Sequence, residues 1–168
     1  EATHTFCLVP LKALAEEKFQ DFNNKYAKWG LKVAISTRDR AEYDDDLLSY
    51  QVIIATYEKM NALVVRTPEL IDHVGVVVVD ELQNIGELSR GVTLEILLTT
   101  LVIAPRRPQI IGLSATISNP KEIAEWMDAV LVETDKRDVE LREGIVYTGL
   151  GTMEFEGLSL DKGDFIYR

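Results

Sequence analysis

The sequence contains very little of what builds disulfide frameworks or metal clusters. Among its 168 residues there is one cysteine, Cys7, and there are two histidines, His4 and His73. A single cysteine excludes an internal disulfide and a cysteine-cluster zinc site, and it fits a reducing compartment. The two histidines have no partners at the spacing that metal ligands require. We therefore exclude a disulfide-stapled secreted domain.

Long hydrophobic runs are also missing. The longest apolar stretches, such as residues 74–79, fall far short of the about 18–20 residues that span a bilayer. No basic segment followed by an apolar one opens the chain, as a secretory signal would. These observations predict a soluble intracellular protein without a membrane partner. The first residue is Glu1 rather than Met, so we also expect a piece of a longer polypeptide.

Basic side chains are outnumbered by acidic ones. The chain has 18 Lys and Arg residues against 28 Asp and Glu residues, a net charge of −10. Residues 1–40 alone carry a net charge of +2, because they contain seven basic and five acidic side chains. Non-specific affinity for nucleic acid comes from neutralising phosphates, which an acidic protein does poorly. Any contact with nucleic acid should therefore be local and made partly by backbone N–H groups.

Short apolar runs rich in β-branched residues alternate with segments of helical period, a pattern typical of a parallel sheet covered on both faces. Strands are predicted at residues 5–9, 31–37, 51–56, 74–80 and 109–113, with a weaker one at 130–133. Helices are predicted at residues 11–28, 44–49, 58–65, 91–101 and 120–127, the last capped by Asn119. The predicted fold class is α/β, with a doubly wound, mostly parallel sheet and helices on both faces.

The last part of the chain has a different character. Five of the ten glycines follow Asp135, and helical period gives way to short strand-like pieces at residues 144–147 and 164–167. We expect residues 1–135 to form one domain and residues 136–168 to be a linker and the start of the next.

The first motif whose side chains could take part in catalysis is an apolar strand that ends in two adjacent carboxylates, Asp80 and Glu81. In open α/β sheets, ligands bind beyond the carboxyl ends of the strands. Asp80 suits a hydrated Mg²⁺ ion, and Glu81 suits the orientation or deprotonation of an attacking water. Taken alone, the motif is equally a strand that ends in a solvated turn.

The second motif follows another β-rich run, 34 residues after Asp80, and reads Ser114-Ala115-Thr116. Two hydroxyls at a strand end can bridge groups on the nucleotide side and the partner side. Taken alone, the motif is a Ser/Thr turn or a helix cap.

Together the two motifs resemble those of superfamily 2 helicases, in which D-E-x-H precedes S-A-T; this chain reads Asp80-Glu81-Leu82-Gln83 and then Ser114-Ala115-Thr116. Further segments are similar to the branch that includes archaeal fork-repair DNA helicases and the exosome and splicing DExH helicases: residues 8–18, 53–59, 89–95, 123–126 and 137–144. The resemblance covers nearly the whole chain and is strongest to the archaeal DNA helicases. It implies a RecA-like fold that is incomplete at the N-terminus.

The resemblance implies that the protein uses ATP and Mg²⁺ and that two motifs contact the backbone of a nucleic-acid strand. These motifs are Pro10, Leu11 and Lys12, and Thr56, Glu58 and Lys59. Both follow predicted strands, where helix N-termini offer backbone donors to phosphates. Simpler interpretations stay open, because Lys12 is also a typical solvated helix charge and Glu58 a typical first-turn acid.

By the same resemblance, catalysis and its coupling to nucleic acid fall to Asp80, Glu81, Gln83, Ser114 and Thr116. Asp80 and Glu81 are the cofactor-binding pair, and Asp80 holds Mg²⁺ through water. Gln83 is a departure, because close relatives have His there. An amide keeps a donor and an acceptor, so we expect a hydrogen bond from Gln83 to Ser114 or Thr116.

A larger departure is the lack of a G-x-x-x-x-G-K-[ST] phosphate loop. Residues 86–93 have the glycine spacing but carry Val92 where the lysine is needed, so we interpret this as a chance match. In the family the phosphate loop lies upstream, and a second lobe with an arginine finger lies downstream. We therefore expect most of a first motor lobe, truncated at both ends and inactive by itself.

The leading hypothesis is thus part of an ATP-dependent DNA helicase motor that acts on single-stranded or forked DNA together with a second RecA-like lobe. One alternative is a non-catalytic nucleic-acid or protein interaction module with the same fold. Another is an RNA helicase of the same branch, since no residue recognisably reads a 2′-hydroxyl. The expected location is the cytoplasm, at the nucleoid if the source is archaeal, or the nucleus if it is eukaryotic.

Overall fold

The computed structural model describes residues 4–40, 44–134, 145–146, 152–155 and 158–161. The chain divides into two units, residues 1–131 and residues 132–168. The described strands of the first unit form a five-stranded sheet, and those of the second form a three-stranded sheet. Every helix among the described residues is too short or too polar to traverse a bilayer.

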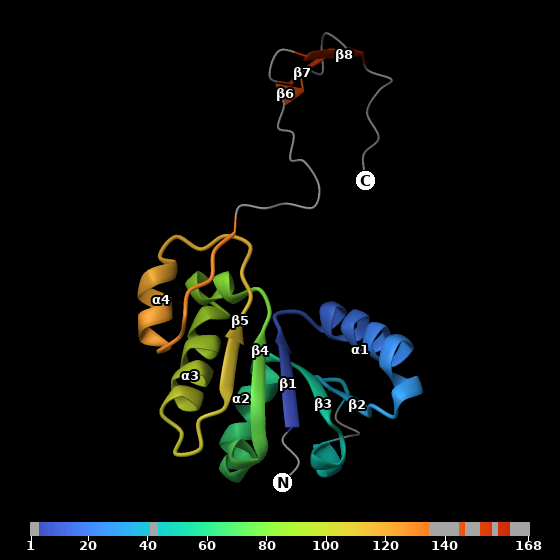
Figure 1. Cartoon of the computed structure of the whole chain (residues 1–168), viewed down its shortest axis with the longest axis vertical. Coiled ribbons are helices and arrows are strands. Elements are labelled where there is room, and N and C mark those ends of the chain that lie inside the picture. The colour runs from blue at the N-terminus through green and yellow to red at the C-terminus, as the bar shows by residue number, and fades with distance from the viewer. Residues whose placement is uncertain (1–3, 41–43, 135–144, 147–151, 156–157, 162–168) are drawn as a thin grey trace. The chain divides into compact units, whose positions relative to one another are not determined.

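The first unit is an α/β layer structure around a parallel sheet (Figure 1). Its strands are β1 (His4–Val9), β2 (Val33–Ser36), β3 (Val52–Thr56), β4 (Val74–Val79) and β5 (Gln109–Gly112), in the spatial order β2-β3-β1-β4-β5. All four neighbouring pairs are parallel. Its α-helices are α1 (Lys12–Tyr26), α2 (Tyr57–Arg66), α3 (Gly91–Val102) and α4 (Pro120–Trp126). The predicted fold class is confirmed.

Short 3₁₀ helices complete the first unit: η1 (Ala27–Trp29), η2 (Asp44–Ser49), η3 (Pro68–His73) and η4 (Leu82–Gly86). The last of these directly follows the Asp80-Glu81 turn.

The sheet separates two hydrophobic cores, because successive side chains of a strand point to opposite faces. On β1, Phe6 and Leu8 belong to the larger core, which includes the apolar faces of α2 and α3. Cys7 and Val9 belong to the smaller core, into which α1 packs Ala15. Strands buried on both faces need continuous apolar sequence, which explains why β1 and β3 lack polar alternation.

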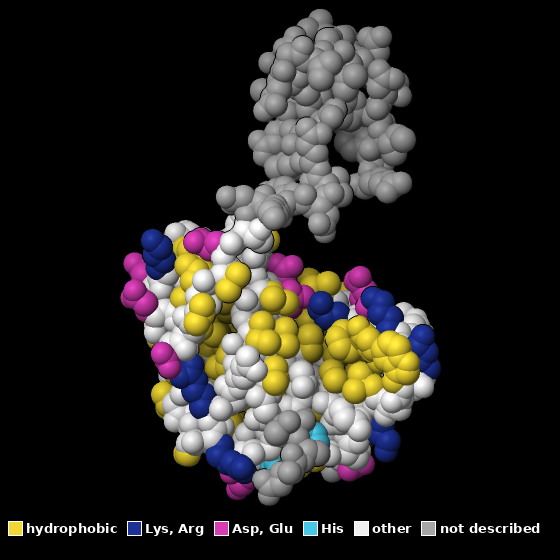
Figure 2. All heavy atoms as spheres, viewed as in Figure 1, with side chains coloured by type: hydrophobic (Ala, Val, Ile, Leu, Met, Phe, Trp, Pro, Cys, Tyr) yellow, Lys and Arg dark blue, Asp and Glu magenta, His cyan; other side chains and the backbone are white. Residues whose placement is uncertain are grey.

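The face that carries α1 is only partly covered by the described residues. Helix α1 packs over β1, β2 and β3, whereas Val76 and Val78 of β4 are only half-buried. Beside them, Ile111 is 39% exposed and Leu113 is 47% exposed. Figure 2 shows hydrophobic side chains open to solvent on this view of the sheet. The half of the sheet that ends in β5 therefore has an apolar surface.

Two predictions of local structure are wrong, and a third is met only in part. The predicted strand at 130–133 is not formed, and Val130 and Val132 are 89% and 84% exposed, so its β-branched residues have no described strand to pair with. The predicted helix at 44–49 is the 3₁₀ segment η2, interrupted by non-helical backbone at Asp46. Asn119 stands at the N-cap position of α4, as predicted, although its side chain makes no bond to the helix backbone and its amide donates to the Glu122 carboxylate at 2.8 Å.

The second unit contains an antiparallel sheet of β6 (Ile145–Val146), β7 (Thr152–Phe155) and β8 (Leu158–Asp161), in that order. The strand-like piece predicted at 144–147 overlaps β6. The piece predicted at 164–167 lies outside the described residues. The interpretation of residues 136–168 as a linker and the start of another lobe stays a prediction.

Candidate functional site

The topology brings the sequence-predicted site residues to one edge of the sheet. In the ladder, Val9 of β1 lies beside Thr56 of β3, and Val79 of β4 lies between Leu8 of β1 and Gly112 of β5. The chain continues from these strand ends directly into the two predicted nucleic-acid motifs, the carboxylate pair and the Ser-Ala-Thr segment. Parallel strands share a carboxyl edge, so four separate segments meet there.

Asp80 is held by contacts from its own turn and from α1. Its Oδ1 accepts the Glu81 backbone N–H at 3.1 Å, and its Oδ2 lies 2.9 Å from Lys18 Nζ. The Asp80 backbone N–H donates to the Leu8 carbonyl at 2.9 Å, which continues the ladder of β1 and β4. The carboxylate is therefore fixed at the end of β4 and is already beside a cation.

Glu81 adopts the left-handed backbone conformation, with φ of 56° and ψ of 46°. This conformation costs a residue other than glycine about 1–2 kcal/mol, so the neighbouring structure must stabilise it. The buried Tyr57 hydroxyl donates to the Asp80 carbonyl and lies 3.4 Å from the Glu81 carbonyl. Burial raises the pKa of Tyr57 to about 12, so its hydroxyl stays a donor into alkaline solution.

A hydrogen-bonded path leads from Glu81 to the Ser-Ala-Thr segment. The Gln83 amide nitrogen donates to the Glu81 carboxylate, and the Ser114 hydroxyl donates to Gln83 Oε1 at 2.8 Å. Backbone bonds run alongside, because the Leu82 N–H donates to the Leu113 carbonyl at 2.8 Å. The structure thus contains the predicted bond between Gln83 and Ser114. Of the two expected partners, Ser114 is the one that bonds to Gln83; within the described residues, Thr116 makes no hydrogen bond to Gln83.

The first predicted nucleic-acid motif lies where β1 passes into α1. Leu11 is 43% exposed, and the exposed Lys12 ammonium pairs with the Asp39 carboxylate. A hollow of about 280 Å³ is lined by Pro10 and Leu11 on one side and by Glu81 and other residues of the following turn on the other. The motif therefore borders the carboxylate turn.

The second predicted motif opens α2. Thr56 is its N-cap, and the Thr56 hydroxyl oxygen accepts the Lys59 N–H at 3.4 Å. Glu58 is exposed in the first turn, 4.0 Å from the Arg90 guanidinium. Tyr57 lies between these residues in sequence and is the one that reaches the carboxylate turn.

The carboxylate pair suits one kind of metal ion. Among the described residues, no three His, Cys, Asp or Glu side chains cluster as a metal cage would require. Two adjacent carboxylates at a strand end instead match Mg²⁺, which keeps several waters and binds one or two carboxylates together with phosphates. Asp80 and Glu81 thus fit Mg²⁺ bound with a nucleotide.

Sequence reasoning missed Lys18 and Tyr57. Lys18 lies in the middle of α1, and its contact with Asp80 depends on how the helix packs on the sheet, which no local pattern encodes. For Tyr57 the sequence offered one indication. An aromatic residue within a motif that is predicted to lie at the surface suggests that this side chain is buried.

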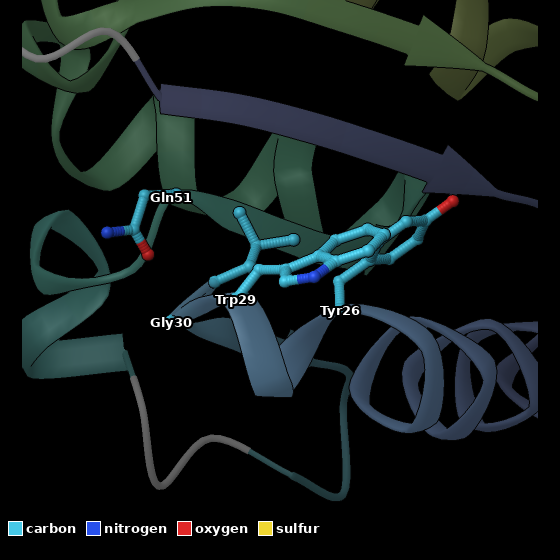
Figure 3. Close-up of a pocket in the computed structure, with 5 residues that line it drawn as sticks. Tyr26, Trp29, Gly30 and Gln51 are labelled. Carbon is cyan, nitrogen blue, oxygen red and sulfur yellow. The ribbon is translucent and has the colours of Figure 1, made fainter.

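A second hollow, of about 320 Å³, lies away from this site. Figure 3 shows it between η1 and the start of β3, with the rings of Tyr26 and Trp29 close together. Leu31 and Gln51, which also line it, precede β2 and β3, so the hollow is at the amino edge of the sheet. It contains no residue of the predicted motifs.

The fold and the site define a class. A parallel α/β sheet whose carboxyl edge combines an Asp-Glu turn, a Ser-Ala-Thr segment and two helix N-termini is a RecA-like helicase lobe. The sequence profile of the DEAD/DEAH box helicases matches residues 1–123. This chain belongs to the DEAD/DEAH box helicase family.

Several curated relatives are archaeal. The chain is 50% identical over 142 residues to the ATP-dependent DNA helicase Hel308 of Pyrococcus horikoshii, covering 84% of this chain and 19% of the relative. It is 51% identical over 138 residues to Hel308 of Methanocaldococcus jannaschii, covering 82% of this chain and 11% of the relative. With Hel308 of Caldivirga maquilingensis the identity is 47% over 149 residues, 89% of this chain and 20% of the relative. The resemblance predicted from the motifs is confirmed, and the matches span a fifth or less of these relatives' lengths.

Proposed function

We propose that this chain is most of the first motor lobe of an ATP-dependent DNA helicase. The observation that carries the proposal is the path at the carboxyl edge from the Glu81 carboxylate through Gln83 to the Ser114 hydroxyl. It joins a turn suited to nucleotide chemistry to a neighbouring strand end. Relatives that match most of the chain are named ATP-dependent DNA helicases, which supports the same function for the longer parent polypeptide.

In this proposal Asp80 and Glu81 divide the work of hydrolysis. Asp80 binds Mg²⁺ through water, and the ion, when bound, neutralises charge on the phosphates. Glu81 accepts a proton from the attacking water or orients it. The left-handed backbone at Glu81 turns the chain directly after β4, and the Gln83 amide donates a hydrogen bond that holds the Glu81 carboxylate in place.

Other parts of the machinery belong to the rest of the parent polypeptide. The chain has no phosphate-loop lysine, so we assign the loop to an upstream segment, and the exposed apolar surface beside β5 gives such a segment a place to pack. We assign the arginine finger to a second lobe beyond residue 168. Because the sequence has no phosphate-loop motif to bind a triphosphate, we propose that the chain alone does not hydrolyse ATP.

Single-stranded or forked DNA is the proposed nucleic-acid partner. Pro10, Leu11 and Lys12 at α1, together with Thr56, Glu58 and Lys59 at α2, present two adjacent helix starts to a strand backbone. Backbone donors there compensate for the net charge of −10. We further propose a cytoplasmic location, at the nucleoid if the source is archaeal.

The test compares DNA and RNA of one sequence with the parent polypeptide. ATP hydrolysis is measured alone, with each single strand, and on forked duplexes on which strand separation is followed in parallel. We expect DNA to stimulate hydrolysis and the fork to open. Stimulation by RNA alone would indicate an RNA helicase, and strand binding without any hydrolysis would indicate the non-catalytic module.

A further inference from the structure

The contact between Lys18 and Asp80 has no place in the function proposed so far. Lys18 Nζ lies 2.9 Å from Asp80 Oδ2, and the two side chains are only 32% and 22% exposed. The other Asp80 oxygen accepts the Glu81 N–H. Lys18 therefore contacts the Asp80 oxygen that is not tied to the Glu81 turn.

The contact also joins two functional segments. Lys18 belongs to the helix that begins at the first nucleic-acid motif, and it follows Lys12 by six residues, less than two turns of α1. If a bound strand displaced the N-terminus of α1, the helix would carry that displacement to Lys18. The carboxylate proposed to bind Mg²⁺ is thus directly attached to the helix proposed to bind DNA.

Other lysines of α1 make different contacts. Lys25 pairs with Asp21 one turn earlier on the same helix, at 2.8 Å, and both side chains are about half exposed. Lys12 pairs with Asp39, which follows β2. Of these three described lysine ion pairs of α1, only that of Lys18 reaches the carboxylate turn, so its charge has a specific position relative to the site.

An ammonium group and a hydrated Mg²⁺ ion would compete for the oxygens of the Asp80 carboxylate. Both cations need Asp80 oxygens, and they repel each other when they share them. We propose that Lys18 is a positioning residue that holds Asp80 in the metal-free lobe and yields this oxygen when Mg²⁺ binds. Because coupling between two ligands is reciprocal, DNA that moves α1 and Lys18 away from Asp80 raises the affinity for the ion. This inference rests on the proposed function.

The test measures metal binding itself. Mn²⁺, whose free form is counted by electron paramagnetic resonance, replaces Mg²⁺ and is titrated into the parent polypeptide with ADP, with and without single-stranded DNA. The variants are Lys18→Met, which keeps the chain length and removes the charge, and Lys18→Arg, which keeps the charge. Lys25→Met is the matched control, because it makes the same change in another paired lysine of the same helix.

We expect Lys18→Met to bind Mn²⁺ about fivefold more tightly than wild type without DNA, the factor that loss of a competing, partly exposed ion pair gives. DNA should tighten Mn²⁺ binding in wild type and in Lys18→Arg, and should have little effect in Lys18→Met. Lys25→Met should match wild type. A role limited to stability would lower the melting temperature of Lys18→Met and leave its Mn²⁺ affinity unchanged.

Two results overturn the inference. One is Mn²⁺ affinity in Lys18→Met that is equal to or weaker than that of wild type, while wild type still hydrolyses ATP in response to DNA. The proposed function then survives and only the role of Lys18 is wrong. The other is a wild-type parent that binds no Mn²⁺ with ADP, which overturns the assignment of Asp80 and with it both proposals.

Discussion

Glu81 has a left-handed backbone conformation, and its side chain is hydrogen-bonded. Both features affect what a substitution at this position does. Its carboxylate accepts the Gln83 amide, and its carbonyl lies near the Tyr57 hydroxyl. Glu81→Gln keeps the size of the side chain but removes the carboxylate that is proposed to accept a proton from water. In the parent polypeptide we expect nucleotide affinity to be unchanged and turnover to fall by about 10²-fold or more.

The measurement is the rate of ATP hydrolysis beside the affinity for a fluorescent nucleotide. Glu87→Gln is a matched control, since Glu87 lines the same hollow as Glu81 and lies outside the carboxylate turn. Normal turnover in Glu81→Gln would remove this residue from the water-activating role.

Tyr57 gives a prediction in alkaline solution. Burial raises its pKa from 10.0 to about 12, so between these values the unfolded chain releases the proton and the folded chain keeps it. The unfolded state then binds fewer protons, and the free energy of unfolding falls as the pH rises from about 10 towards 12. Tyr57→Phe lacks this contribution, so its free energy of unfolding should decline less steeply. Between about pH 10 and 12 the variant should lose about 1–3 kcal/mol less than wild type.

Melting temperatures of the chain and its variants between pH 9 and 11.5 test this. Tyr26→Phe serves as the control, because Tyr26 lines the hollow at the opposite edge of the sheet and should keep the steep decline. Equal slopes for wild type and Tyr57→Phe would mean that Tyr57 titrates like an exposed tyrosine.

At the scale of elements, the bond between Gln83 of η4 and Ser114 after β5 links two segments that are 31 residues apart. A neutral hydrogen bond of this kind contributes about 0.5–1.5 kcal/mol to stability, too little to decide the fold. In the parent polypeptide, Ser114→Ala together with Thr116→Ala, which leaves the contact between Gln83 and the Glu81 carboxylate in place, should therefore uncouple strand separation from hydrolysis and leave the melting temperature nearly unchanged. Hydrolysis and strand separation are measured side by side; if they fall in proportion, or if neither changes, the coupling role is wrong.

The junction of η4 and α3 gives a second prediction at this scale. A Cβ added at Gly91 would lie 2.3 Å from the Ile85 carbonyl oxygen, which is backbone and cannot turn aside, whereas one added at Gly86 would meet nothing within 4 Å. Gly91→Ala should therefore destabilise the chain by about 1–3 kcal/mol. Denaturant unfolding measures this, with Gly86→Ala as the control, and equal stability of the two variants would contradict the crowding.

The same junction shows what sequence could and could not reveal. Gly86 and Gly91 have the spacing of a phosphate loop, and their interpretation as a chance match agrees with the tight packing of Gly91 against Ile85. The strand positions were predictable because β-branched runs buried on both faces leave a clear pattern. Residues 130–133 are also rich in β-branched side chains but form no strand. A strand needs a neighbouring strand to pair with, and a local sequence pattern does not reveal whether one is present.

Within the candidate site, the motifs predicted which residues meet, because parallel strands end at one edge. The distances depended on packing. Ser114, and not Thr116, reaches Gln83, and Lys18 reaches Asp80 from the middle of a helix. Such contacts depend on how α1 and η4 pack on the sheet. That packing is determined by the whole core and not by any local sequence pattern.

On the scale of the whole molecule, charge governs how the chain alone meets a nucleotide. The carboxylate pair repels a triphosphate, the net charge is −10, and the sequence holds no phosphate-loop lysine. We expect isothermal titration calorimetry of the 168-residue chain with ATP and Mg²⁺ to detect no binding in the micromolar range. Micromolar affinity would show that this lobe has a triphosphate site of another kind, and the parent polypeptide is the positive control.

The apolar surface beside β5 affects how copies of the chain associate in solution. β5 is the last strand of the described sheet, so its outer edge presents backbone donors and acceptors next to exposed Ile111 and Leu113. Edges of this kind recruit strands from other copies. At low ionic strength, mutual repulsion from a charge of −10 keeps copies apart. Added salt shortens the range of that repulsion to about 3 Å at 1 M, so concentrated salt should promote self-association of this chain.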